Sequence, residues 1–304
     1  NRAASSYRPP AETGSLEILS GAWDSDGAVV GAMGTHPWTG LVLVLYASGF
    51  TWVGWMLRRE HRRIVRGVPR AHAWLIPLVV ATGAAYGLLG AASGTWRERP
   101  LFFAGVGCAL AGIYLASCVV VRRLPLGRGG LAWVAVVAIV ARLLALGIAP
   151  SDDVNRYIVE GTQVRAGENP YVVPPARSSV GDELPPEVLA GVNHPEWTAI
   201  YPPLTLLVEA GITHVTVDPL GFKLAMLLAE LTGLLLVLGL LVRSEFPRSW
   251  ILFAAWNPLG PLFGVGEGHH DFLMAALVAA ALWLWAHERV GGGVVAAVMA
   301  AMIK

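Results

Sequence analysis

Apolar runs of about 20 residues recur along this chain, and they limit its fold more than any other feature. A helix of that length crosses the hydrocarbon core of a bilayer. Only 14% of the 304 residues are charged, against about 25% in soluble domains, and the mean hydropathy is +0.57. Because a helix satisfies its own backbone hydrogen bonds in lipid, the sequence predicts an all-α fold, a polytopic transmembrane helical bundle.

Arginine clusters between these runs predict the topology. Six arginines follow the first run between residues 58 and 70, and three follow the third between residues 122 and 128. Cytoplasmic loops carry an excess of Lys and Arg, so we expect both clusters in the cytoplasm and the loop after the fourth run outside. The sequence predicts four parts. They are a disordered tail rich in Ser, Gly and Pro (1–38), four transmembrane helices (39–149), an extracytoplasmic loop (150–219) and further transmembrane helices (220–304).

The expected spans are 39–57, 72–92, 101–121, 129–149, 220–242, 249–266, 272–286 and 291–304. Because the last run is still apolar at Lys304, we expect the natural chain to continue with further spans. Inside the outer loop, residues 204–217 are apolar but too short to cross. Prolines at the start of this run and Asp218-Pro219 after it are typical of helix boundaries, which predicts a short helix at the outer interface.

A polar segment, SDDVNRYIVEGTQVRAGENPYVVPP, begins at Ser151 where the fourth run stops. On a helix, i, i+3, i+4, i+7 spacing would place four polar residues on one face: Asp153, Arg156, Tyr157 and Glu160. The adjacent acids Asp152 and Asp153 could act as a general base, coordinate a divalent ion or cap the helix. Capping alone does not explain the polar face behind them, so the segment is a candidate reaction site.

Three further clusters are ambiguous on sequence alone. The turn at Asn169-Pro170-Tyr171 could contact a sugar or anchor an aromatic ring at the interface. The stretch from Asn193 to Tyr201 could bind substrate or only start a helix. The GEGHHD motif could contact phosphate, bind a metal or cap a span. The candidate substrate or phosphate ligands are Arg156, Tyr157, Glu160, Asn169, Tyr171, His194, Tyr201, Lys223, Glu267, His269, His270 and Asp271.

Charges inside the apolar runs are costly in hydrocarbon and need partners. Arg142 and Glu230 could form a structural pair. Alternatively, Arg142, Lys223 and Lys304 could hold an anionic lipid headgroup. We assign no metal ligands and leave a divalent ion open as a cofactor, and the net charge of +1 gives no reason to expect a nucleic-acid partner.

Three motifs in this order, SDDVNRY with GENPY, NHPE with YPPL, and WNPL with GEGHHD, resemble the polytopic GT-C glycosyltransferases. They are most similar to bacterial polyprenol-phosphate-mannose-dependent mannosyltransferases, and the resemblance covers residues 151–304. It implies that Asp153, with Asp152 beside it, is the catalytic carboxylate that accepts the acceptor's proton in an inverting transfer. The chain departs from the family's pattern at two positions: Asn155 stands where an aromatic residue is expected, and His270 stands where many relatives have Asn before the Asp.

The resemblance further implies a polyprenyl-phosphate sugar donor, with mannose as the expected hexose, and a lipid or glycan acceptor. It places the protein in the bacterial plasma membrane as a multi-pass enzyme with an extracytoplasmic site. The alternatives are a transporter or flippase of a polyprenyl-linked sugar, and a structural membrane subunit. A transporter would keep its acids near the bilayer midplane, whereas the strongest cluster here lies in the outer loop, which favours the enzyme.

Overall fold

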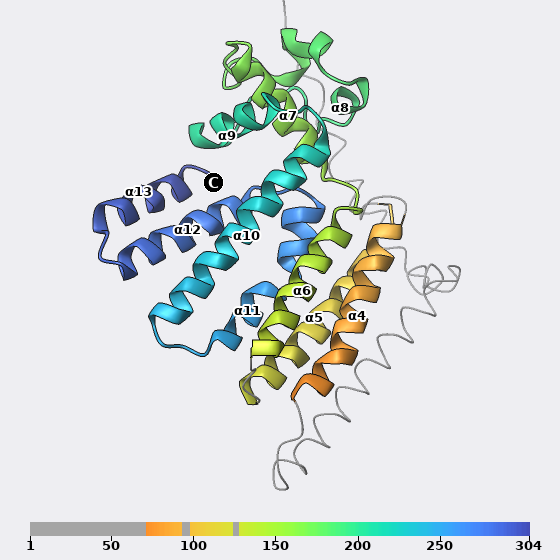
Figure 1. Cartoon of the computed structure of the whole chain (residues 1–304). Coiled ribbons are helices and arrows are strands. Elements are labelled where there is room, and N and C mark those ends of the chain that lie inside the picture. The colour runs from red at the N-terminus through yellow and green to blue at the C-terminus, as the bar shows by residue number, and fades with distance from the viewer. Residues whose placement is uncertain (1–70, 93–97, 124–127) are drawn as a thin grey trace, which may run out of the picture.

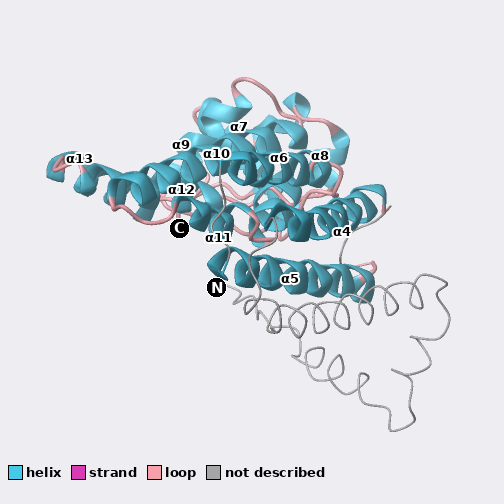
Figure 2. Cartoon of the chain, turned by 60° about the horizontal axis from the view of Figure 1, so that its bottom comes forward, coloured by secondary structure: helices cyan, strands magenta, loops and turns pink. Residues whose placement is uncertain are grey.

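The computed structural model describes residues 71–92, 98–123 and 128–304. Throughout these residues, all regular secondary structure is helical (Figures 1 and 2), which confirms the all-α fold. The expected tail, the first span at 39–57 and the first arginine cluster lie outside the described residues.

A bundle of long apolar helices forms the body of the molecule (Figure 1). Helix α4 (Ala71–Ala91) packs against α5 (Pro100–Arg123) and α6 (Arg128–Ala145), and α10 (Pro219–Arg243) lies on the other side of α6. Within the described residues, two segments are long and apolar enough to cross a membrane, Pro100–Arg122 and Pro219–Arg243, and a bent pair described below could provide a third. The molecule is therefore a membrane helical bundle.

The segment at 249–266, expected as a span, is not one continuous helix. The chain instead forms the short η3 (Arg248–Trp250) and α11 (Ile251–Ala255), and then the π-helix η4 (Gly260–Gly266). Pro258 and Pro261 lack backbone N–H donors and so interrupt the regular helical ladder. The π-helix meets α12 (Asp271–Ala286) at 114°.

The end of the chain forms a helical hairpin. Helix α12 is followed by α13 (Val290–Ala301), whose 12 residues make it shorter than the expected span. After α13 the chain turns back towards the start of α12. There the carbonyl of Ile303 accepts a 2.6 Å hydrogen bond from Oγ1 of Thr205, a residue of the loop 150–219. The start of α12 and the end of α13 therefore lie on the side of the molecule where the outer loop packs.

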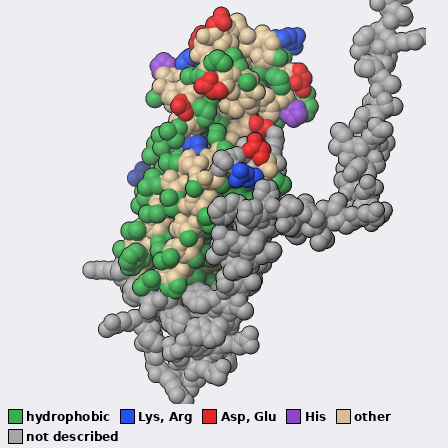
Figure 3. Space-filling view, turned by 90° about the vertical axis from the view of Figure 1, so that its right-hand side faces the viewer, with side chains coloured by type: hydrophobic (Ala, Val, Ile, Leu, Met, Phe, Trp, Pro, Cys, Tyr) green, Lys and Arg blue, Asp and Glu red, His purple; other side chains and the backbone are tan. Residues whose placement is uncertain are grey.

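The loop 150–219 folds into a layer that covers one end of the bundle, here called the cap layer (Figure 1). Its longest helices are α7 (Asp152–Arg165) and α9 (Pro203–Thr213), which matches the short helix expected near 204–217. The remaining elements are η1 (Pro175–Arg177), η2 (Ser179–Glu183) and α8 (Pro186–Ala190). Charged and histidine side chains gather at this end, above a largely hydrophobic body (Figure 3).

Close packing of two helices shapes the cap layer. Gly161 of α7 lies against the backbone of α9, where an added Cβ would sit 2.6 Å from the carbonyl carbon of Glu209. Below them a small apolar core includes Val154, Ile158 and Phe222, all with no exposed surface. The cap layer is therefore held to the top of α10 by its own core, which positions the polar residues of α7.

Candidate active site

Helix α7 begins as the capping interpretation expected. The Ser151 side-chain oxygen accepts a hydrogen bond from the backbone N–H of Asp153 at 3.3 Å, and Asp152 and Asp153 occupy the first turn. Negative side chains there are favoured by the helix dipole. Capping explains the start of the helix. Capping does not explain the polar face that follows on α7. On this face Arg156, Tyr157 and Glu160 are 6%, 1% and 0% exposed.

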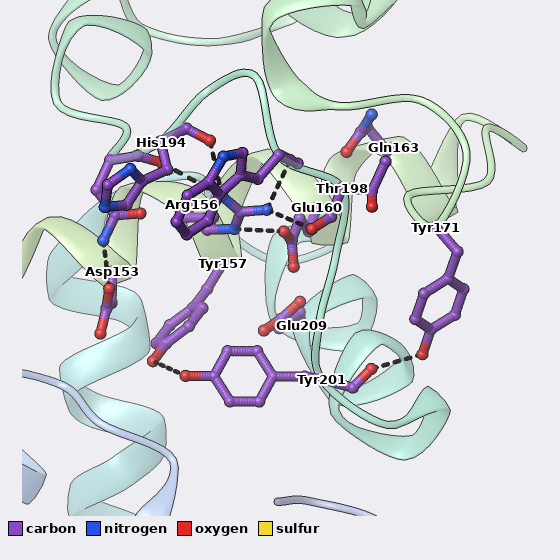
Figure 4. Close-up of polar contacts among 12 residues, drawn as sticks. Asp153, Arg156, Tyr157, Glu160, Gln163, Tyr171, His194, Thr198, Tyr201 and Glu209 are labelled. Carbon is purple, nitrogen blue, oxygen red and sulfur yellow. Dashed lines mark hydrogen bonds and ion pairs between the residues drawn. The ribbon is translucent and has the colours of Figure 1, made fainter. Parts of the chain in front are cut away.

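Arg156 is committed to the protein itself (Figure 4). Its Nε donates to Glu160 Oε1 at 2.7 Å, and its two terminal nitrogens donate to four backbone carbonyls. An arginine has five N–H donors, and all five are used here. The carbonyls belong to Asn193, His194, Trp197 and Thr198, at 2.8–3.3 Å. Arg156 thus clamps the loop 193–198 onto α7, and we assign it a positioning role in place of the expected phosphate contact.

Asp153 lies where three distant segments meet. Asn193 Nδ2 donates to its Oδ1 at 2.5 Å, and His269 Nδ1 lies 3.7 Å from its Oδ2. The carboxylate side chain is 31% exposed. The clusters expected to share the outer face therefore come together around this one acid, although they lie 40 and more residues apart in the sequence.

His269 is the basic side chain that faces Asp153. Its Nε2 lies 3.1 Å from Glu267 Oε2, and this hydrogen bond, with the nearby carboxylates of Asp153 and Asp271, raises the pKa of the imidazole. Lys304 lies in the same region and binds the Asp271 carboxylate at 2.8 Å, and both of these side chains are nearly half exposed. His269 and Lys304 therefore supply positive charge next to Asp153.

Two other acids of the cap layer are buried. Glu209 on α9 and Glu160 on α7 have no exposed surface, and burial raises the pKa of both carboxyl groups, with Arg156 opposing the rise for Glu160. Glu209 Oε1 lies 3.6 Å from His270 Nε2, and burial lowers the pKa of that imidazole to about 3. Burial therefore favours the neutral forms of both groups, and neither Glu160 nor His270 faces solvent as a substrate ligand would.

Within the described part of the chain, several atoms of this buried cluster have no hydrogen-bond partner. They are Glu160 Oε2, Gln163 Oε1, both carboxyl oxygens of Glu209 and both ring nitrogens of His270. Figure 4 shows Glu209 between Glu160 and the ring of Tyr201. The Tyr157 ring packs on His270 with centroids 3.9 Å apart, and its hydroxyl lies 3.3 Å from that of Tyr201.

The turn at residues 169–171 is held by its own hydrogen bonds. Asn169 Oδ1 accepts from the backbone N–H of Tyr171 at 3.0 Å, and the Tyr171 hydroxyl donates to the Tyr201 carbonyl at 2.6 Å. Asn169 therefore shapes the turn. Tyr171 joins this turn to the loop that carries Tyr201 and remains 41% exposed.

The intramembrane charges form structural contacts. The expected pair is confirmed: Arg142 Nε donates to Glu230 Oε2 at 2.9 Å, and a second nitrogen binds Oε1 at 2.5 Å. Arg142 also donates to the Ala255 carbonyl, which the break after α11 leaves without a helical partner. Lys223 donates to the carbonyls of Leu146 and Ile148 at the end of α6. Such groups must be satisfied in lipid, so Arg142 and Lys223 stabilise helix ends.

The sequence analysis named the stretch from Asn193 to Tyr201 but did not single out two residues of this site within it. Asn193 holds Asp153, and it stands inside the NHPE motif, so the motif itself was the signal. Trp197 lies four residues further on without any pattern to mark it. Across the described residues, no group of three or more His, Cys, Asp or Glu side chains lies in a geometry that could hold a metal ion.

Comparison with known proteins places this site in a family. Residues 91–304, more than half of the chain, match the MptA_B family model described as "Alpha-(1->6)-mannopyranosyltransferase, N-terminal domain". No curated protein and no solved structure matches the chain. The matched range includes the whole cap layer and the GEGHHD motif.

Proposed function

The chain belongs to this family of membrane mannosyltransferases, and on that premise we propose that it transfers mannose from a polyprenyl-phosphate donor to a sugar hydroxyl on the extracytoplasmic face. Membership makes the protein a glycosyltransferase, which favours the enzyme over the transporter. A lipid-linked donor accounts for a catalytic chain built into a membrane bundle, because the polyprenyl tail stays in the bilayer while the sugar reaches the cap layer.

One observation carries the proposal: Asp153 is a partly exposed carboxylate held by Asn193 and faced by His269. A sugar hydroxyl is too weakly acidic to attack unaided, so a positioned base must accept its proton as the new bond forms. Glu160 and Glu209 are excluded from this role because both are fully buried. Asp153 is therefore the base, and Asn193 fixes the orientation of its carboxylate.

In the proposed step, the acceptor oxygen bonds to C1 of the donor mannose while the bond from C1 to the phosphate oxygen breaks. The hydroxyl proton goes to Asp153, and the polyprenyl phosphate leaves with the electron pair. For an α-(1→6) product, the nucleophile is a 6-hydroxyl, and inversion at C1 requires a β-linked donor. His269 and Lys304 stabilise the charge that develops on the phosphate, since basic groups held in place beforehand favour a transition state in which negative charge develops.

The test is mannose transfer from labelled polyprenyl-phosphate mannose in membranes that contain the full-length protein. Asp153→Asn should reduce transfer by about 10²- to 10⁴-fold, the usual contribution of a general base. Asp182→Asn, an exposed acid of η2 in the same cap layer, is the matched control and should leave transfer unchanged. A parallel sample with EDTA measures any dependence on a divalent ion.

Equal transfer by wild type and Asp153→Asn would remove Asp153 from the mechanism. Asp152→Asn is measured alongside for this reason, because the neighbouring acid shares the first turn of α7. Loss in Asp152→Asn with full activity in Asp153→Asn would move the base to Asp152. No transfer by the wild type would contradict the proposed donor.

A further inference from the structure

Two exposed aromatic rings stack on the loop 193–201. The imidazole of His194 and the indole of Trp197 are nearly parallel, with centroids 4.2 Å apart and an interplanar angle of 9°. Trp197 is 55% exposed, and the His194 side chain is 57% exposed. The two stacked rings together form an exposed aromatic surface at the polar end of the molecule.

The loop that carries this stack is rigid. Arg156 binds the carbonyls of both stacked residues, at 3.0 Å for His194 and 2.8 Å for Trp197. A neighbouring loop ties it further, because the backbone N–H of Ala176 donates to the Pro195 carbonyl at 2.7 Å. The backbone of His194 has φ +42°, a left-handed conformation that non-glycine residues rarely adopt. Such strain persists only where the surroundings impose it, and it concentrates at functional sites.

The stack also adjoins the proposed base. Asn193, which donates to Asp153 Oδ1, is the residue before His194. His269 lies on the other carboxylate oxygen, Oδ2, and belongs to the turn at the start of α12. The two oxygens of Asp153 therefore face different parts of the molecule, one towards the loop 193–198 and the other towards the cationic groups.

We propose that the His194–Trp197 stack is the subsite for the acceptor sugar. The apolar C–H face of the acceptor mannose packs on the exposed indole, and its 6-hydroxyl then points to Asp153. The donor phosphate occupies the His269 side, so the two substrates approach the carboxylate from opposite sides. This inference rests on the proposed function and adds the location of the acceptor to it.

The surroundings of the indole fit a sugar. Exposed tryptophans also occur at membrane interfaces, where the apolar ring lies in lipid and the N–H edge faces water. Here the indole carries an imidazole on one face, and Glu196 lies 3.8 Å from that imidazole with 62% of its side chain exposed. Hydrogen-bonding groups beside an open ring suit the hydroxyls of a pyranose, whereas a membrane anchor has no need of them.

The test uses the octyl glycoside of α-(1→6)-linked mannobiose as the acceptor probe, with labelled polyprenyl-phosphate mannose as the donor. Trp197→Ala should raise the KM for the probe about tenfold, the scale of one lost aromatic contact, with the donor KM unchanged. Trp197→Phe keeps a ring and should remain within about threefold of wild type. The matched control is Trp250→Ala. Trp250 also stacks on an aromatic ring, Phe246, and is 38% exposed, but it belongs to η3, which follows the end of α10 that lies away from the cap layer.

A binding measurement separates this inference from the catalytic one. In the Asp153→Asn protein, isothermal titration with the same probe requires no turnover, and adding Trp197→Ala should weaken binding about tenfold. If that loss occurs while Asp153→Asn still transfers mannose, the subsite stands and the catalytic assignment falls. If Asp153→Asn abolishes transfer but the probe binds equally with and without Trp197, the subsite is wrong.

Two other results would also overturn the subsite. A rise in the donor KM with an unchanged probe KM would place the stack on the donor side of the site. A fall in kcat with an unchanged probe KM would make it a support for the loop alone. If Trp197→Ala does not accumulate, Trp197→Leu, which keeps apolar bulk without a ring face, is measured in the same way and should show the same rise in probe KM.

Discussion

Asp153 and Glu209 are acids of the same cap layer with opposite surroundings. Asp153 is 31% exposed and accepts a hydrogen bond from Asn193, whereas Glu209 is fully buried beside His270. Burial without a partner disfavours the charged form of a carboxyl group and raises its pKa. Depth in the cap layer therefore decides which acid can accept a proton from a substrate and which one is held neutral between helices.

Glu209→Gln should change how stability depends on pH. In the unfolded chain Glu209 ionises near its ordinary pKa of 4.5, while in the folded protein its pKa is raised well above that value. Above pH 4.5 the folded state therefore holds the extra proton, so wild-type stability falls as pH rises towards the folded pKa. Glutamine cannot ionise. The variant should lack this decline and should melt a few degrees higher than wild type at pH 8, at about 2–4 °C per kcal/mol.

The measurement is thermal unfolding in detergent between pH 5 and pH 8. Glu187→Gln, an exposed acid on α8, is the control and should follow the wild-type curve. Parallel curves for wild type and Glu209→Gln would show that Glu209 is ionised in the folded protein, with its charge balanced by Arg156 or His270.

At the scale of elements, the site depends on the contact between α7 and α9. Gly161 allows the two backbones to touch, which brings Glu160 and Glu209 together and leaves Asp153 at the free end of α7. The Arg156 clamp then fixes the loop 193–198 over the same helix. The polar face of α7 therefore assembles the cap layer, and only its first turn reaches the substrate side.

Gly161→Ala should destabilise the protein by about 1–3 kcal/mol, as overpacking does in other cores. The new Cβ would approach the backbone of Glu209 to 2.6 Å, and a backbone cannot yield as a side chain can. The matched change is Gly211→Ala on α9, where an added Cβ meets no atom within 4 Å. It should be neutral or stabilising by up to ~1 kcal/mol through helix propensity. Thermal unfolding of both variants in detergent tests this, and equal effects would refute close packing at Gly161.

At the scale of the whole molecule, polar residues and apolar helices separate into two zones. The cap layer carries the charged and histidine side chains, and the bundle beneath it exposes mainly hydrophobic ones (Figure 3). Arg243 ends α10 and Arg248 begins η3, at the end of the bundle away from the cap layer. Under the positive-inside rule, this arrangement predicts that the cap layer is extracytoplasmic.

Cysteine labelling tests that orientation. In a background with Cys108→Ser and Cys118→Ser, Glu187→Cys in the cap layer should react with a membrane-impermeant maleimide in intact cells. Glu245→Cys, in the turn after α10, should react only after the cells are permeabilised. The reverse pattern would place Asp153 in the cytoplasm and would favour a donor available on that side.

Local sequence patterns determined the fold class, the polar face of α7 and the family of this protein. Apolar run length indicated a membrane bundle, helical spacing placed Asp153, Arg156, Tyr157 and Glu160 on one helix, and motif order indicated the family that the comparison confirmed. The sequence also offered the Arg142–Glu230 pair as one of two alternatives for Arg142, because a charge in hydrocarbon needs a partner, and the structure shows that pair. These features depend on the residues of one segment or on the cost of burying one charge.

Tertiary structure decided what each polar residue contacts. The sequence nominated Arg156 and Lys223 for phosphate, but packing brings backbone carbonyls within reach of both, and an unpaired carbonyl is costly in a buried site. Pro258 and Pro261 interrupt the span at 249–266, but only the fold shows that Arg142 of another helix binds a carbonyl left free at this break. Asn193 reaches Asp153 across 40 residues of sequence. Such contacts depend on how helices pack in three dimensions, and no period or local spacing along the chain records that packing.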